Sequence, residues 1–400
     1  MRGKMIQRVV YGTLLLVLLI GCSSGPATGF PEGAITLGVV TSITGSKAAF
    51  GEAQKNGYEL ALEEINAAGG VSGHSLELIY VDDQSEPEKA IVAAEQLITQ
   101  DEVPMVLGSY SSNCTFPMAG VTEAHQTPLI SPCAATDTLT QQGYEWVFRI
   151  NAPSSQYSET MFDFLSEMTD AQTVAILFES TDFGTSTARA ARKSAEARGF
   201  EVVAYEPYDA NASDLTPLLT TVKEVQPDVV FAVSYLADAV LLMQQSHEID
   251  LNAHLFAGGA AGFTLPAFIE QAGSDTEHVV SVSQWATDVN WPGAQEFTRK
   301  YQERYGELPG LHAAETYTAL YLAADVLERA NSLDKEKIQA ALRDTDIEQT
   351  IFGPIKFDQT GQNEHEMVVM QIQNGQFVTV YPPEYAAAEP VYPVPPWSDR

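Results

Sequence analysis

Hydroxyl and amide side chains follow directly after an apolar run in the first third of the chain. Val106 and Leu107 indicate the end of a buried strand, and Phe116 and Pro117 restore an apolar pattern. The polar set between them comprises Ser109, Ser111, Ser112, Asn113 and Thr115. Such hydroxyls, together with the free N–H groups at the start of a helix, donate hydrogen bonds where the helix dipole favours negative charge. We therefore expect a site for a carboxylate or an amide oxygen, although the same side chains would also serve as helix caps.

The elements around this stretch alternate between strand and helix. Strand patterns, with the loops that follow them, occur at 34–45, 74–84, 103–108 and 127–132, and helix patterns at 51–73, 86–100 and 116–126. The alternation restarts with strands at 173–180, 201–208, 227–234 and 253–259, and helices over roughly 184–198, 214–224 and 236–248. Short connections between such elements predict α/β units, each with a parallel sheet flanked by helices. Helices at 293–305 and 312–330 and an antiparallel-looking pair at 353–362 and 366–382 follow.

The charge balance limits the classes of partner. Lys and Arg number 21 against 53 Asp and Glu, which gives a formal net charge of −32 over 400 residues. Such a surface repels phosphate backbones, so we expect no nucleic-acid partner, and it is a poor surface for anionic lipid.

The first residues are typical of an export signal. Arg2, Lys4 and Arg8 precede an apolar stretch of 13 residues that is too short for a comfortable membrane span. It ends in Leu19-Ile20-Gly21-Cys22, which resembles the bacterial lipobox, whose cysteine is acylated. We therefore expect a signal peptide over 1–22, a flexible tether over 23–33, and an exported protein anchored to the membrane by lipid on Cys22, periplasmic or at the cell surface. An ordinary secretory signal is the alternative.

Two cysteines remain after the signal, Cys114 and Cys133. An exported chain meets an oxidising compartment, so the two can pair. They follow neighbouring predicted strands, whose spacing of about 4.8 Å is compatible with the Cα separation of a disulfide. We expect this bond.

Signatures of catalysis are absent from the sequence. It has no GxSxG elbow, no HExxH motif, no P-loop and no Cys/His cluster with zinc spacing. We therefore expect a protein that is not an enzyme and that carries neither cofactor nor metal.

Eight segments, in order, resemble the type I periplasmic binding proteins, in the branch that binds leucine, isoleucine and valine for ABC importers. They are "LGVVTSITGSKAAFGE", "GYELALEEINAAGGVSG", "YVDDQSEPEKAIVAAEQLI", "VLGSYSS", "PLISPCAATDTLT", "FRINAPSSQ", "PDVVFAVSYLADAVLLMQQ" and "FGPIKFDQTGQ". The resemblance covers about 34–382 and implies two α/β lobes, joined by three crossing strands, that close on a ligand by a hinge. It implies lobe one at 34–150 and 283–350 and lobe two at 151–282 and 351–383. The composition of 384–400 predicts a Pro-rich tail that is extended or disordered.

The resemblance also implies ligand-binding residues, because open α/β sheets bind ligands outside the carboxyl ends of their strands. Ser112 matches the family serine that grips the α-carboxylate of the ligand, and the "SPxAT" loop maps to Ala134, Ala135 and Thr136. Tyr235 matches the tyrosine near the ligand ammonium. Phe50 and Phe183 stand where the family often has Tyr before Gly, so both rings remain without their hydroxyls.

One departure from the family pattern concerns charge. The glutamate that binds the ammonium falls on Gly259 here, and a buried ammonium without an anion is unfavourable. Either Glu179 or Asp182 replaces it, or the ligand has no ammonium. Trp285 follows a crossing strand and either lines the pocket or belongs to the core.

The first interpretation is thus a monomeric, lipid-anchored solute-binding protein that captures a branched-chain or other amino acid and delivers it to the permease of an ABC importer. The second is the same fold binding a small amide, urea or an aromatic or organic acid. A ligand sensor for a signalling partner is the third, and a hydrolase is disfavoured because the sequence has no arrangement of nucleophile and base.

Overall fold

The structure, a computed structural model, describes residues 29–400. The predicted signal peptide, Cys22 and most of the predicted tether lie outside the described residues. Within the described range, none of the helices combines the length and the apolar character that crossing a bilayer requires.

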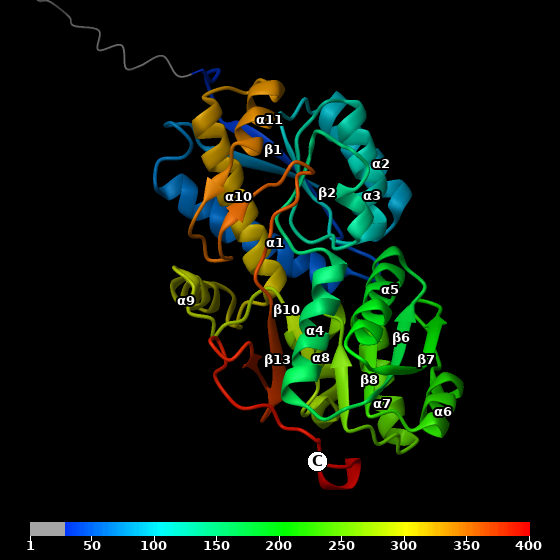
Figure 1. The fold of residues 1–400 in the computed structure, drawn as a ribbon. Coiled ribbons are helices and arrows are strands. Elements are labelled where there is room, and N and C mark those ends of the chain that lie inside the picture. The colour runs from blue at the N-terminus through cyan, green and yellow to red at the C-terminus, as the bar shows by residue number, and fades with distance from the viewer. Residues whose placement is uncertain (1–28) are drawn as a thin grey trace, which may run out of the picture.

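The first sheet contains five parallel strands in the order β2-β1-β3-β4-β5 within the described residues. Its strands are β1 (Ile35–Thr41), β2 (Leu76–Asp82), β3 (Val106–Gly108), β4 (Leu129–Ser131) and β5 (Val147–Arg149). The helices around it are α1 (Ala48–Ala67), α2 (Pro87–Thr99), α3 (Ser112–Ala124), α9 (Ala294–Tyr305), α10 (Leu311–Ala330) and α11 (Lys335–Arg343). We call this part, with the short pair β11 (Asp346–Ile347) and β12 (Ile355–Lys356), lobe one; it is the upper half of Figure 1.

Alternation along the strands explains why both faces of this sheet are covered. Successive side chains of a strand point to opposite faces. Leu107, Ile130 and Phe148 share a core with α1 and α10, whereas their neighbours in sequence, Val106, Leu129 and Val147, share a core with α2 and α3. A parallel sheet that is buried on both faces needs such continuous apolar runs.

The second sheet has seven strands in the order β14-β13-β10-β9-β8-β6-β7, again within residues 29–400. Its parallel part is β6 (Thr173–Glu179), β7 (Glu201–Tyr208), β8 (Val229–Val233), β9 (Leu255–Gly258) and β10 (Val280–Ser283), and the hairpin β13 (Val368–Gln373) and β14 (Gln376–Tyr381) completes it. The helices here are α4 (Ser154–Met168), α5 (Asp182–Ala197), α6 (Thr216–Val225), α7 (Leu236–Glu248) and α8 (Pro266–Ala272). We call this part lobe two.

The second sheet is mixed, which corrects the prediction of a parallel sheet in each lobe. β13 lies antiparallel to β10 and to β14. The β13/β14 pairing has a local reason: Asn374 and Gly375 both have positive φ, which suits the tight turn of a two-residue hairpin. The predicted antiparallel pair is therefore the hairpin within 366–382, while β12 pairs with β11 in lobe one.

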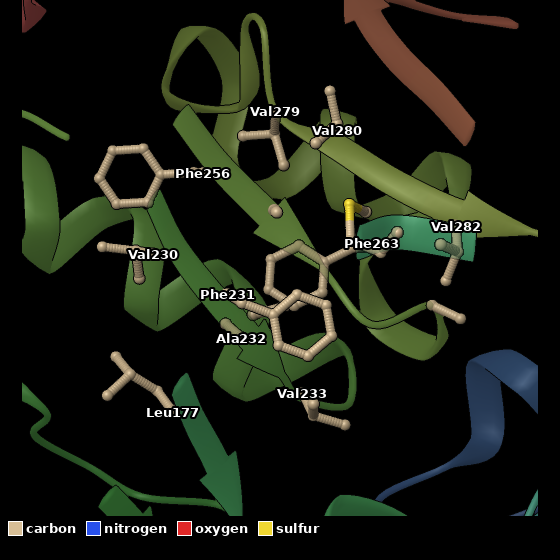
Figure 2. Packing of buried hydrophobic residues seen from close by; sticks show 14 of the residues in the cluster. Leu177, Val230, Phe231, Ala232, Val233, Phe256, Phe263, Val279, Val280 and Val282 are labelled. Atoms are coloured by element: carbon tan, nitrogen blue, oxygen red, sulfur yellow. The ribbon is translucent and has the colours of Figure 1, made fainter. Parts of the chain in front are cut away.

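The core of lobe two forms where the apolar strands meet (Figure 2). Phe231 and Val233 of β8, Phe256 of β9 and Phe263 belong to one cluster of buried side chains with Val282 of β10. All five residues of β8 are buried, and this strand lies inside the sheet between β9 and β6.

Three segments cross between the lobes. They connect β5 to α4, β10 to α9, and β12 to β13. The first and third lie side by side, because the Arg149 N–H donates to the Gly361 oxygen over 2.8 Å and the Arg149 Nε–H donates to Gln362 Oε1 over 2.5 Å. Phe352, Ile355 and Phe357 pack in the lobe-one core, so the stretch before Asp358 lies with lobe one rather than with lobe two, where the resemblance placed 351–383.

The Pro-rich tail packs against lobe two, so of the two alternatives, extended or disordered, the structure favours the extended one. Trp397 is buried and its indole N–H donates to the Leu251 oxygen over 2.8 Å, and the Val394 N–H donates to the His254 oxygen over 2.9 Å. The tail thus covers one end of lobe two, where the C-terminus lies in Figure 1.

Candidate ligand-binding cavity

A small cavity lies between the two lobes, where the carboxyl ends of strands from both sheets meet. Its volume is about 20 Å³ for a water-sized sphere, which is room for about one water molecule. Lobe one contributes Tyr110, Ser112, Cys133, Ala135, Leu311 and His312, and lobe two contributes Tyr157, Phe183, Tyr235, Ala260 and Ala261. A larger hollow of about 260 Å³ has Trp285, Met370 and Phe377 in its lining.

The three serines after β3 divide into three roles. The Ser109 hydroxyl donates to the buried Asp83, which also accepts from Ser42 Oγ over 2.7 Å. Ser111 is the N-cap of α3 and accepts from the Cys114 N–H over 3.3 Å. Ser112, in the first turn of α3, lines the cavity, and its oxygen accepts from the Thr136 N–H over 3.1 Å. The Ser112 proton is therefore available to a ligand at the positive end of a 13-residue helix.

The predicted loop at 134–136 is held from behind by Arg149. Its Nη1 donates to the carbonyl oxygens of Ala134, over 3.1 Å, and Thr136, over 2.7 Å. Burial lowers the pKa of this guanidinium to about 10. Ala135 reaches the cavity, whereas Ala134 packs in the core beside α3 and the Thr136 hydroxyl shares a hydrogen bond with Thr138 Oγ1.

Aromatic rings from both lobes contact one another around the cavity. Phe50 stacks on Tyr110 with ring centroids 4.4 Å apart, and its edge contacts Tyr235, at 5.7 Å, and His312, at 5.4 Å. Phe183 lies 5.7 Å from Tyr235. Phe183 and Tyr235 line the cavity as expected, while Phe50 supports three of the lining rings from behind.

The lobe-two loop after β9 presents small apolar groups to the cavity. A Cβ on Gly259 would meet Val233, Phe231 and Thr187 in the core, so this position points away from the cavity. Its neighbours Ala260 and Ala261, both with positive φ, form that part of the wall. The prediction that position 259 faces the ligand is therefore corrected, and the loop offers no carboxylate at either of its lining positions.

Glu179 and Asp182, the two predicted substitutes for the glutamate that binds the ammonium, lie outside the cavity lining. Asp182 is exposed in the first turn of α5, where its backbone N–H donates to Asn113 Oδ1 of lobe one over 3.1 Å. Glu179, at the end of β6, is buried, and neither carboxyl oxygen has a hydrogen-bond partner among the described residues. Burial, and next to it the neighbouring Asp238, raises the pKa of Glu179 to about 9, so this carboxyl group is neutral at pH 7.

Trp285 belongs to the core. Its indole N–H donates to the Ile351 oxygen over 3.0 Å, and its ring contacts Phe297 edge-on at 5.6 Å. It lies under the larger hollow and not at the cavity between the lobes. Of the two alternatives for this residue, the structure favours the core.

Cys114 and Cys133 are free thiols, which corrects the predicted disulfide. Although they follow neighbouring strands, their side chains enter different layers. Cys114 packs with α2 and α3, whereas Cys133 faces α1 and α10. Burial raises the pKa of the Cys133 thiol well above its usual value.

Cys133 is part of a buried polar cluster that the sequence reasoning did not identify. Its sulfur lies 2.8 Å from Glu315 Oε2, and His312 Nδ1 lies 2.8 Å from the same oxygen. The three residues place donor atoms within 4.8 Å of one another, and thiol, imidazole and carboxylate are the ligand types of zinc. In this structure the three groups satisfy one another by hydrogen bonds. The "LHAAE" stretch, a His/Glu pair three residues apart in an apolar helix, was the available signal.

Comparisons with known proteins agree with this architecture. A family model described as periplasmic binding protein matches residues 34–376. The chain is similar to Leu/Ile/Val-binding protein homolog 7 of Brucella suis, with 30% identity over 372 residues that cover 89% of this chain and 93% of the relative.

Solved structures give the same result. A branched-chain amino acid binding protein of Streptococcus pneumoniae, in complex with isoleucine, superposes with a TM-score of 0.80 at 28% identity, covering 86% of this chain and 97% of that one. A leucine-binding protein of Thermotoga maritima has a TM-score of 0.82 at 24% identity, with coverage of 86% and 97%, and supports the fold.

Proposed function

The chain belongs to the periplasmic binding protein family, and from this premise we propose that it captures a small carboxylate solute, an amino acid in the first instance, in the cavity between its lobes and delivers it to an ABC importer. Its relatives and structural neighbours include a Leu/Ile/Val-binding protein homolog and the substrate-binding protein of a branched-chain amino acid transporter. As in that family, the place of action is outside the cytoplasm.

The single observation that carries the ligand class is Ser112. Its hydroxyl lies at the cavity, in the first turn of α3, and its oxygen is already engaged by the Thr136 N–H. Its proton, together with the helix dipole, suits a carboxylate. The aromatic rings of Tyr110, Phe183 and Tyr235 suit the apolar body of the solute.

Capture requires motion of the lobes. A cavity of about 20 Å³ cannot admit an amino acid, so the lobes must separate for entry. We propose that they close again on the ligand, since a ligand that touches both walls favours the closed state by its differential affinity. Small-angle scattering should give different profiles with and without saturating ligand, and identical profiles would contradict closure.

A second candidate is a ligand without an ammonium, such as an amide or an aromatic acid. The observation that favours it is the lobe-two wall, where Ala260 and Ala261 offer no charged group and the remaining lining residues are aromatic. In this case the hydroxyl of Ser112 would bind the same carboxylate or amide oxygen.

A thermal-shift screen tests the function. The panel contains the twenty L-amino acids, urea, small amides, and aliphatic and aromatic carboxylates. We expect a concentration-dependent rise in melting temperature with at least one carboxylate, because ligands that bind only the folded state stabilise it. A panel without any stabilising solute would contradict the proposal.

The mode of attachment is a separate part of the proposal. The Leu19-Ile20-Gly21-Cys22 sequence supports a lipid anchor. Cys22→Ala should release the expressed protein from the membrane fraction, or leave it unprocessed, whereas the parent chain should partition with membranes. Equal partitioning of both, with both cleaved to the same mature length, would count against the anchor.

A further inference from the structure

A buried polar cluster lies behind the lobe-one wall, and its side chains have no role in the proposed binding of a carboxylate. It joins Gln54 of α1, Cys133 after β4, Gln284 after β10, and both His312 and Glu315 of α10. Four separate segments thus meet in one cluster, in which Cys133, Gln284 and His312 contact the Glu315 carboxyl group and Gln54 contacts Cys133. Cys133 and His312 also line the cavity, which connects the cluster to the ligand site.

The hydrogen bonds define where the protons are. The Thr41 hydroxyl donates to Gln54 Oε1 over 2.5 Å, so the amide nitrogen of Gln54 faces Cys133 and donates to its sulfur over 3.0 Å. The thiol keeps its proton, because burial raises its pKa, and donates it to Glu315 Oε2. Gln284 Nε2 donates to Glu315 Oε1 over 3.2 Å. A carboxyl group that accepts on both oxygens has the pattern of an ionised carboxylate.

The imidazole of His312 connects the Glu315 carboxylate to the cavity, because it contacts the carboxylate and lines the cavity wall. Since an ionised carboxylate only accepts, the 2.8 Å contact requires the proton on His312 Nδ1. In the neutral ring, Nε2 then carries a lone pair. This Nε2 is buried and has no hydrogen-bond partner among the described residues, although the ring forms part of the cavity wall. Nε2 is therefore an unpaired acceptor on a ring that lines the cavity, and a ligand donor could bind it.

The other acids near the cavity are poor alternatives. Glu179 is neutral at pH 7, Asp182 is exposed, and Ala260 and Ala261 occupy the loop after β9. Within residues 29–400 the basic side chain in contact with Glu315 is His312, whose ring is neutral in the arrangement described above, and the cavity lining includes neither lysine nor arginine. A buried carboxylate with so little compensating charge favours a cation nearby.

We propose that His312 and Glu315 form the part of the ligand site that binds an ammonium group: the ligand N–H donates to His312 Nε2, and Glu315 behind it supplies the negative charge. This inference rests on the proposed function and names its ligand class as α-amino acids. The recognition of the cationic end thus comes from lobe one, in contrast to the expectation that lobe two supplies the anion.

The test compares acids with and without an amino group. Binding of the twenty L-amino acids to the full chain is measured by calorimetry, and each amino acid that binds is compared with the same acid lacking its amino group, for leucine 4-methylpentanoate. We expect the parent chain to prefer the amino acid by about a hundredfold or more, since an unpaired buried charge is strongly unfavourable.

Two variants assign that preference to the cluster. Glu315→Gln keeps the shape of the side chain, and His312→Phe keeps a ring in edge contact with Phe50 and Tyr110. Both should lose most of the preference for the amino acid while their affinity for the deaminated acid changes by no more than about threefold. Glu179→Gln is the matched control on the opposite wall and should retain the full preference.

The outcomes separate this inference from the proposed function. A chain that binds no solute of the panel contradicts both. Binding of carboxylates without any preference for the ammonium, or a preference that survives in both Glu315→Gln and His312→Phe, overturns the inference and leaves the solute-binding function standing. Loss of the preference in Glu179→Gln but not in Glu315→Gln would transfer the role to lobe two and also overturn it.

Discussion

Two buried glutamates lie behind opposite walls of the same cavity, and their surroundings differ. Glu315 in lobe one accepts hydrogen bonds from Cys133 and Gln284 and contacts His312 Nδ1. Glu179 in lobe two has no well-formed hydrogen bond at either oxygen within the described residues, and it lies beside another acid, Asp238, and the backbone of Tyr235. Donors stabilise the charged form of a carboxyl group, whereas burial without donors favours the neutral form. Burial alone therefore does not show which acid is available to a cation.

The two walls of the cavity also differ in polarity. The lobe-one wall contains the hydroxyl of Ser112, the thiol of Cys133 and the imidazole of His312, while the lobe-two wall contains aromatic rings and two alanines. Lobe one thus holds the polar groups that can position a small solute. Lobe two supplies a cover whose rings exclude water when the lobes meet.

The largest expected effect concerns the stability contributed by Glu315. Glu315→Leu would leave the donors of Cys133, His312 and Gln284 buried without an acceptor, and each such group is unfavourable. We expect the free energy of unfolding to fall by about 4 kcal/mol, measured by urea denaturation at pH 7. A loss below about 1 kcal/mol would show that the cluster is not a connected unit.

Replacing Glu179 should raise the free energy of unfolding, and the size of the gain should depend on pH. The pKa of Glu179 is raised from 4.5 to about 9 in the folded chain. The stability that the neutral form of Glu179 contributes to the folded chain is therefore fully present below pH 4.5. It is lost as the pH rises toward 9, by at most about 1.4 kcal/mol per pH unit.

Glu179→Gln stays neutral throughout that window. The variant should therefore gain about 2 kcal/mol relative to the parent chain between pH 6 and pH 8, measured from melting curves or urea titrations at each pH. Parallel pH profiles for the two proteins would show that Glu179 is ionised in the folded state.

Ser112 should matter for affinity more than for stability. Ser112→Ala removes a hydroxyl that can donate to the ligand carboxylate, and we expect about tenfold weaker binding of the best solute by calorimetry. Thr115→Val is the matched control, because it removes a buried hydroxyl from the same helix that has no partner within the described residues. Equal losses in both variants would indicate a general effect on α3.

The smallest effect is expected on the lobe-two wall. Tyr235→Phe keeps the ring that contacts Phe50 and Phe183 and removes only the hydroxyl. If lobe two acts as an apolar cover, the affinity should change by less than about threefold. A tenfold loss would assign the tyrosine hydroxyl a direct role and weaken the contrast between the walls.

Much of the fold was accessible from the sequence. The alternation of strands and helices and the eight family segments predicted two α/β lobes, and the structure and the comparisons confirm the family and the fold. Helix α4 was missed, although Tyr157, Met161, Phe164 and Leu165 follow helical spacing. The hairpin at Asn374-Gly375 was also readable, but the neighbour against which β13 packs was not, since sheet order depends on contacts between distant segments.

The sequence by itself determined which residues follow which strand, and therefore that Ser112, Ala135, Phe183 and Tyr235 gather at the carboxyl ends of the sheets. Local order and the period of two along a strand are sufficient for that. Only the tertiary structure decided which acid has donors, because Gln54, Cys133, Gln284 and Glu315 come from segments up to 261 residues apart. It also decided that Cys114 and Cys133 point into different layers and that Gly259 faces the core, since a side chain's direction depends on the packing of its whole lobe.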